Sequence, residues 1–205
     1  IERGTWNAKV YNYNSERGIP GAIVNNVWRR GERVWDTNSF FQGSFVKEVN
    51  DQFKTQVNAK YAFYRTHYVN NDDKLIEVDN LYKQREVYVS TANMYTIFPF
   101  WDVSMSYDFQ WNEMKADMYG FVFPTRFTNL LSIATALRLG KVKLQGSGLA
   151  TFVNDRVKEG PAPKARQILT PAVFLSYKLF DKHDFSLRAF YKKTFRMPTF
   201  NDLYY

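Results

Sequence analysis

The chain has 205 residues, a formal net charge of +8 and no cysteine, and aromatic residues make up 18% of it. Its mean hydropathy is −0.46, and a soluble domain this polar rarely carries so many large rings. A membrane β-barrel does, because its lumen is polar while its outer face and interfacial girdles are aromatic. The absence of cysteine excludes disulfides, a thiol nucleophile and thiolate metal ligands. The positive charge is spread along the chain, so we expect no nucleic-acid partner.

No apolar run approaches about eighteen residues, so we expect no transmembrane helix. The first residues lead straight into a strand pattern and do not resemble a signal peptide. For a piece of a longer protein, that says nothing about where the parent protein resides.

Hydrophobicity alternates with a period of two along most of the chain, which predicts half-buried strands. The clearest alternation runs from Val103 to Trp111, with apolar odd-numbered residues and hydrophilic even-numbered ones. Strands are predicted at about 4–13, 34–48, 53–64, 83–97, 103–111, 127–139, 142–152, 166–180 and 185–192. Because proline cannot donate a hydrogen bond to a sheet, we expect a bulge or an irregular partner at Pro171.

The predicted connections alternate in length. Short ones fall near residues 50, 99, 140 and 182, and long ones near 14–32, 67–82, 112–125 and 154–165. Short turns at one rim and long loops at the other are typical of outer-membrane barrels, in which the long loops are extracellular. Strand number and alternation alone also fit a soluble β-sandwich.

Two segments carry a family resemblance. Residues 15–21 read Ser-Glu-Arg-Gly-Ile-Pro-Gly, and residues 195–205 read Phe-Arg-Met-Pro-Thr-Phe-Asn-Asp-Leu-Tyr-Tyr. Both are similar to segments of TonB-dependent outer-membrane receptors, in which the second lies midway along the barrel. The residues that match in the second segment are Arg196, Pro198, Asn201, Asp202, Leu203, Tyr204 and Tyr205. They are interpreted as a structural device between a strand and a loop, with turn chemistry at Asn201 and Asp202.

The resemblance implies an all-β fold, an antiparallel up-and-down meander of about nine strands within a transmembrane barrel. Residues 1–205 would form part of a barrel of about 22 strands, with the plug domain and the remaining strands outside this chain. The implied parent protein imports a scarce nutrient complex (a ferric siderophore, haem or a cobalamin) across the outer membrane of a Gram-negative bacterium. Its implied partners are outer-membrane lipid, the nutrient chelate and, through the plug, the TonB system. The alternatives are a soluble carbohydrate-binding β-domain and a passive porin-type channel.

The sequence offers no catalytic or metal-binding constellation, and we expect neither an enzyme nor a cofactor. His67 and His183 fall at opposite rims, so each is interpreted as a solvated loop residue. Asp72, Asp73 and Glu77 lie in a loop rich in Asn and Asp, where adjacent acids are more typical of turns than of glycoside hydrolysis.

Candidate ligand-binding residues are arginines and aromatic residues near the long-loop rim. Rings and guanidinium groups there can hold an anionic chelate or a flat macrocycle by stacking and charge-assisted hydrogen bonds. The candidates are Trp28, Arg29, Arg30, Trp35, Tyr119, Arg156 and Arg166. The alternative is an interfacial aromatic belt with basic residues facing lipopolysaccharide.

Overall fold

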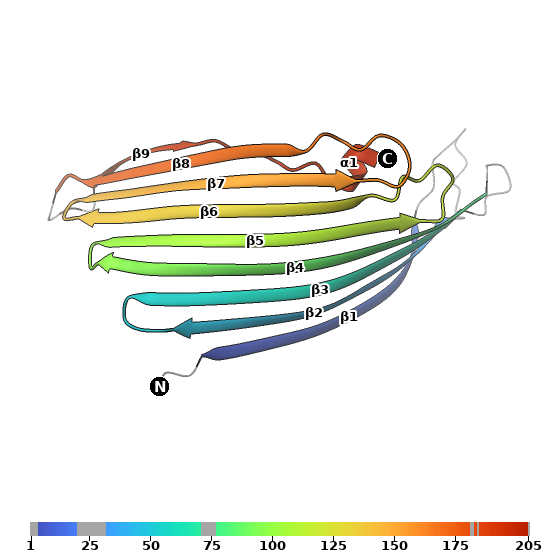
Figure 1. Ribbon diagram of the computed structural model, residues 1–205, viewed down its shortest axis with the longest axis horizontal. Coiled ribbons are helices and arrows are strands. Elements are labelled where there is room, and N and C mark those ends of the chain that lie inside the picture. Colours follow the sequence, from blue (N-terminus) through green and yellow to red (C-terminus); the bar gives the residue numbers. More distant parts are fainter. Residues whose placement is uncertain (1–3, 20–31, 71–76, 181–182, 184, 205) are drawn as a thin grey trace.

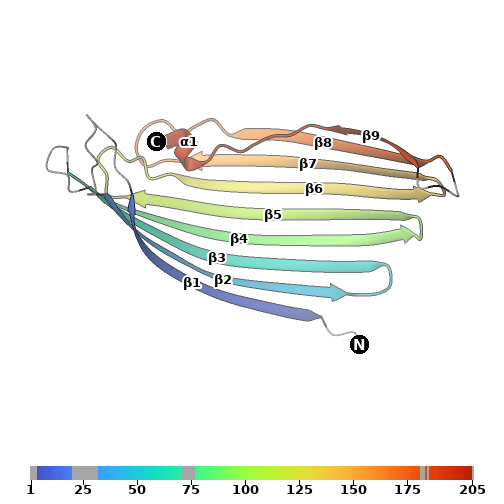
Figure 2. The ribbon, with the colours of Figure 1, turned by 180° about the vertical axis from the view of Figure 1, so that it is seen from behind.

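A computed structural model of the protein describes residues 4–19, 32–70, 77–180, 183 and 185–204. The chain forms one nine-stranded antiparallel sheet in which every strand pairs with its neighbour in sequence (Figures 1 and 2). The strands are β1 Thr5–Ile19, β2 Glu32–Glu48, β3 Phe53–Asn70, β4 Val78–Phe98, β5 Trp101–Ala116, β6 Thr125–Leu139, β7 Val142–Arg156, β8 Arg166–Lys178 and β9 Ser186–Lys192. One short helix, α1 Phe200–Tyr204, follows the last strand. The predicted all-β meander of nine strands is therefore confirmed.

Several strands are longer than their hydrophobic patterns predict. β1 continues to Ile19, which pairs with Glu32, and β3 continues to Asn70, which pairs with Val78. The predicted loops at 14–32 and 67–82 therefore begin too early. The polar residues at these strand ends made them resemble loops, but the backbone ladder continues through them because pairing does not require apolar side chains.

Three connections at one end of the sheet are tight turns, while the fourth, residues 179–185 between β8 and β9, is longer than the short turn predicted near residue 182. The end with the short β2–β3, β4–β5 and β6–β7 turns, at residues 49–52, 99–100 and 140–141, is called the tight-turn end (Figure 1). At the opposite end, the loop end, residues 117–124 join β5 to β6 and residues 157–165 join β7 to β8. The tight turns have local causes. Gly140 has φ +56, and the Asn50 side chain accepts hydrogen bonds from the backbone N–H groups of Gln52 and Phe53.

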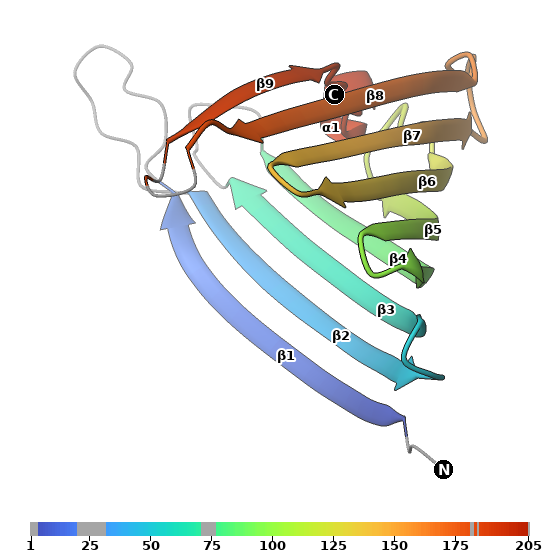
Figure 3. The ribbon, with the colours of Figure 1, turned by 90° about the vertical axis from the view of Figure 1, so that its left-hand side faces the viewer.

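The sheet is curved into an arc and has two unlike faces (Figure 3). We call outer the face that carries the even-numbered residues of β1 and β7 and the odd-numbered residues of the other strands. Large apolar side chains crowd this face, and many are exposed. They include Trp6 (77% exposed), Val10 (78%), Met105 (50%), Ile133 (53%) and Leu169 (60%). No element of the described chain covers them.

The inner face is polar, and hydrogen bonds join its side chains across the strands. The pairs include Thr66–Asp36 (2.7 Å), Asn58–Ser90 (2.9 Å), Lys60–Glu86 (3.0 Å) and Tyr88–Asp108 (2.6 Å). The most deeply buried residues of the strands also lie on this face, among them Ala62 and Thr128, which are 0% and 1% exposed. The polar inner face is therefore the more buried face of the sheet, and the apolar outer face is the more exposed one.

The bulge predicted at Pro171 is absent from the β7–β8 ladder, in which Pro171 lies opposite Gly148 without a register shift. The Pro171 carbonyl accepts a hydrogen bond from Lys193 N–H, on the β9 side. Because the N–H and C=O groups of one strand residue point to the same side, the missing donor also faces β9. The β8–β9 ladder ends at the next pair, Ala172 and Lys192, where the chain leaves the sheet.

We expect the isolated 205-residue chain to self-associate in detergent-free buffer. β1 and β9 each have one strand neighbour in the described sheet, so their free edges can pair with another copy. Self-association would also bury the exposed apolar side chains of the outer face. Size-exclusion chromatography with light scattering checks this, and added neutral detergent should disperse the assemblies. A dispersed monomer that unfolds cooperatively in buffer alone would contradict the expectation.

Candidate functional site

The predicted ligand-binding residues do not converge on one site. Trp28, Arg29 and Arg30 lie outside the described residues. Of the others, Trp35 near the start of β2 and Arg156 at the end of β7 belong to the outer face. Arg166, the first residue of β8, belongs to the inner face, and Tyr119 is fully exposed between β5 and β6. These four residues share the loop end of the sheet but neither a face nor a cavity.

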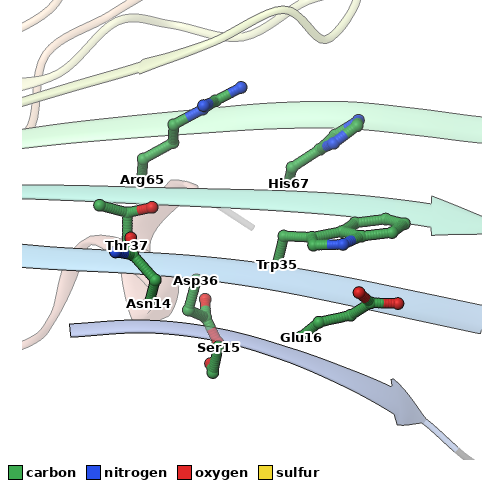
Figure 4. Close-up of a pocket in the computed structure, with 8 residues that line it drawn as sticks. All are labelled: Asn14, Ser15, Glu16, Trp35, Asp36, Thr37, Arg65 and His67. Carbon is green, nitrogen blue, oxygen red and sulfur yellow. The ribbon is translucent and has the colours of Figure 1, made fainter.

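Trp35 lies within β2, where it lines a shallow cavity of about 530 Å³ (Figure 4). The cavity is lined by Asn14, Ser15, Glu16, Trp35, Asp36, Thr37, Arg65 and His67. The Trp35 and His67 rings lie 5.3 Å apart between centroids, and His67 Nε2 lies 2.6 Å from a carboxylate oxygen of Asp79. The prediction that His67 is a solvated loop residue is therefore wrong, because cross-strand contacts hold its ring within β3. His183 is exposed, as expected.

A buried ion pair on the inner face was missed by the sequence analysis. Arg126 Nε and Nη2 donate to the two carboxylate oxygens of Asp155, each over 2.6 Å, and both side chains are less than 10% exposed. Arg126 Nη1 donates to the Pro198 carbonyl, also over 2.6 Å, and the guanidinium lies 4.9 Å from the Phe200 ring centroid. One arginine thus joins β6, β7 and the C-terminal segment.

This ion pair could have been predicted from the pairing register of the β6–β7 hairpin. Leu139 and Val142 flank its tight turn, and counting outward from them places Arg126 directly opposite Asp155. The predicted strands ended at 127 and 152, so neither residue was assigned to the ladder. Opposite charges directly across an antiparallel pair stabilise it.

The C-terminal segment is organised by a capping box, not by the turn predicted at Asn201 and Asp202. Asp202 Oδ2 accepts from Thr199 N–H over 2.7 Å, and Thr199 Oγ1 accepts from Asp202 N–H over 3.2 Å. This Thr-x-x-Asp arrangement begins α1. Of the matching residues in this segment, Pro198 contacts Arg126 and Asp202 caps the helix, while Arg196 is exposed and Leu203 is half-buried. Tyr205 and the side chains of Asn201 and Tyr204 lie outside the described part.

Between the C-terminal segment and the strands lies an inner-face cavity of about 380 Å³. The strands contribute three amide side chains and two charged ones to its lining, and the C-terminal segment contributes a thioether and a ring: Gln84, Gln110, Asn112, Glu86, Arg126, Met197 and Phe200. Asn112 is 8% exposed. Amides next to a ring and a thioether suit a hydroxylated or amide-bearing ligand, because they offer both hydrogen-bond donors and acceptors.

A second inner-face cavity, of about 570 Å³, lies toward the tight-turn end. Small residues such as Ala134, Ala136 and Ala172 form part of its lining, together with Phe174 and Phe190. Phe190 is 81% exposed and is an apolar residue on the polar face. This cavity suits an apolar side chain from another segment.

Within the described ranges, no group of three or more His, Cys, Asp or Glu residues is arranged to hold a metal ion. In those same ranges, no helix has the length and apolar character needed to cross a membrane.

Comparison with known proteins does not assign this chain to a family. It matches neither a protein-family model nor a curated protein.

Replacing Arg126 by methionine should lower the free energy of unfolding by about 3–5 kcal/mol, because the buried Asp155 carboxylate loses its counter-charge. The double variant Arg126→Met/Asp155→Leu should lose less, since no buried charge then remains unpaired. Urea unfolding in neutral detergent micelles, followed by tryptophan fluorescence, measures both. Lys143→Met, an exposed change on the inner face of β7, is the matched control and should cost less than about 0.5 kcal/mol. Equal losses in the Arg126 variant and this control would contradict the role of the pair.

The capping box should be sensitive to acid. Hydrogen bonds from the Thr199 backbone N–H and hydroxyl lower the pKa of Asp202 below its ordinary value of 3.8, and Arg196 adds to this effect. The cap therefore contributes fully above pH 3.8 and is lost as the pH falls through the lower pKa of the folded state. The NMR shift of the Thr199 amide proton should titrate with a midpoint below 3.8, and Asp202→Asn should abolish that titration. A midpoint at or above 3.8 would contradict the hydrogen bonds from Thr199 to the Asp202 carboxylate.

Proposed function

We propose that this sheet is a section of the wall of a transmembrane β-barrel in the outer membrane of a Gram-negative bacterium. Its parent protein is a TonB-dependent importer of a scarce nutrient complex. The proposal rests on how the two faces of the sheet are exposed, which is the reverse of the usual arrangement in a soluble protein. An apolar face left open beside a polar face that is hydrogen-bonded and partly buried suits lipid on one side and a lumen on the other.

The extent of the apolar face supports this reading. On β5 the apolar outer residues run from Trp101 to Trp111, and Glu113 and Lys115 follow on the same face. Eleven residues at about 3.3 Å each suffice to cross the hydrocarbon band as a tilted strand. The change to charged residues then marks where lipid tails give way to headgroups.

The alternation of connections supports the orientation. Tight turns are typical of the periplasmic rim and longer connections of the extracellular rim. On this reading the loop end of the sheet faces outward, and it is at this end that the amide-lined cavity lies.

The importer, rather than a passive channel, is supported by two features. The segments at 15–21 and 195–205 resemble TonB-dependent receptors, and residues 193–200 cover part of the inner face through the contacts of Met197, Pro198 and Phe200. An inner face with one largely apolar cavity, and with residues 193–200 lying across it, suits a filled lumen better than a water-filled pore. A soluble carbohydrate-binding domain does not account for the uncovered outer face.

Nitroxide labels should separate the two faces of β5 in the full-length protein reconstituted in lipid bilayers. Labels at Met105 and at Ile133 on β6 should be relaxed mainly by oxygen, which concentrates in lipid. Labels at Ser104 and Ser106, on the inner face, should be relaxed mainly by a water-soluble nickel chelate. Equal accessibility of both sets of labels to both reagents would contradict the barrel proposal.

A further inference from the structure

Three cationic residues stand side by side on the outer face at the loop end. Arg65 of β3 lies directly opposite Lys83 of β4, and Lys83 lies directly opposite Lys115 of β5. Arg85 follows Lys83 by two residues and so points to the same face. We call Arg65, Lys83, Arg85 and Lys115 the cationic cluster.

The charges of this cluster are only partly compensated by the residues that the structure describes. Directly opposed like charges destabilise a strand pair. Glu113 lies 3.2 Å from Lys115 and directly opposite Arg85, so it is the one carboxylate within the cluster. Among the described residues, Arg65, Lys83 and Arg85 form no ion pair within 4.0 Å. All four cations are exposed. An anion from outside the chain would relieve this repulsion.

The cluster borders the apolar part of the outer face. Tyr61, Val87 and Trp111 form one register row on that face, next to the cluster on its tight-turn side. Arg85 precedes Val87 by two residues and lies on the same face, a step of about 7 Å along the strand toward the loop end. A lipid whose chains contact Val87 therefore has its headgroup at the level of the cationic cluster.

We propose that the cationic cluster binds the phosphate groups of lipids whose headgroups carry net negative charge. The inference rests on the proposed membrane-barrel function, and it adds a chemically defined lipid to that function. Guanidinium groups hold phosphate oxygens through paired N–H donors, while the lysines contribute point charges. The mixed arginine and lysine row suits a phosphate-rich headgroup surface.

Binding of phosphatidic acid to the full-length protein in neutral maltoside micelles tests the proposal, with phosphatidylcholine as the reference lipid. The probe carries an exposed phosphate monoester, and native mass spectrometry counts the lipids bound. The triple variant Arg65→Gln/Lys83→Gln/Arg85→Gln should reduce affinity for phosphatidic acid about tenfold or more. Its weak binding of phosphatidylcholine should not change.

The matched control is Lys143→Gln/Arg188→Gln/Lys192→Gln, which removes the same charge from the inner face near the tight turns. Its affinity for phosphatidic acid should stay within about twofold of the parent, since these cations face away from lipid. Equal losses in both triple variants would reduce the effect to net charge and overturn the proposal, as would undiminished binding by the outer variant. If the outer variant does not assemble, Lys83→Gln alone should weaken binding and flatten its salt dependence.

Two further outcomes are distinguishable. Binding of polyglutamate but not of phosphatidic acid at the cluster would identify an acidic protein as the partner and overturn the lipid assignment. Labels on Met105 that report lipid, together with no effect of the outer variant, would overturn this inference alone. Labels that report water on both faces would overturn the barrel proposal itself.

Discussion

Pairing register is the constraint on which the rest of this structure depends. Side chains alternate between faces, so a slip of one residue in any strand would move its apolar set to the inner face. Eight ladders in succession keep the same assignment of faces from Trp6 on β1 to Tyr191 on β9, apart from a register shift beside the β4–β5 turn. On the inner face, hydrogen bonds such as Lys60–Glu86 join neighbouring strands in this alignment.

The Arg126–Asp155 ion pair also depends on the pairing register. It lies at the loop end of the sheet, where Arg126 contacts both Asp155 on the neighbouring strand and the Pro198 carbonyl. A buried ion pair contributes little net stability compared with apolar residues of similar size, but it is strict about geometry. Its role here is therefore positional: it fixes where the C-terminal segment crosses the inner face. The capping box at Thr199 then directs the chain into α1.

Much of the fold was predictable from the sequence, because a period of two is a local signal. Nine strands and the alternating turns follow from runs such as Val103–Trp111 and from breakers such as Gly140. Strand ends were not predictable in the same way, since Ser15–Ile19 and His67–Asn70 are mostly polar, and their pairing with the next strand leaves no local hydrophobic pattern. The residues of the site were harder to predict than the strands. Arg126 and Asp155 are brought together by hairpin register, and Arg126 meets Pro198 through contacts between distant parts of the chain that no local pattern encodes.

The departure of the chain at Pro171 makes the sheet taper. Nine strands lie abreast at the tight-turn end, but beyond Ala172 the loop-end half of β8 has a strand neighbour only on its β7 side in the described chain. Residues that share the orientation of Pro171 alternate along β8, so the amides of Gln167 and Leu169 point toward this missing neighbour. The wall is therefore wedge-shaped. At its narrow end, β8 has an unpaired backbone edge like that of β1, so we expect local opening of the sheet along this seam as well.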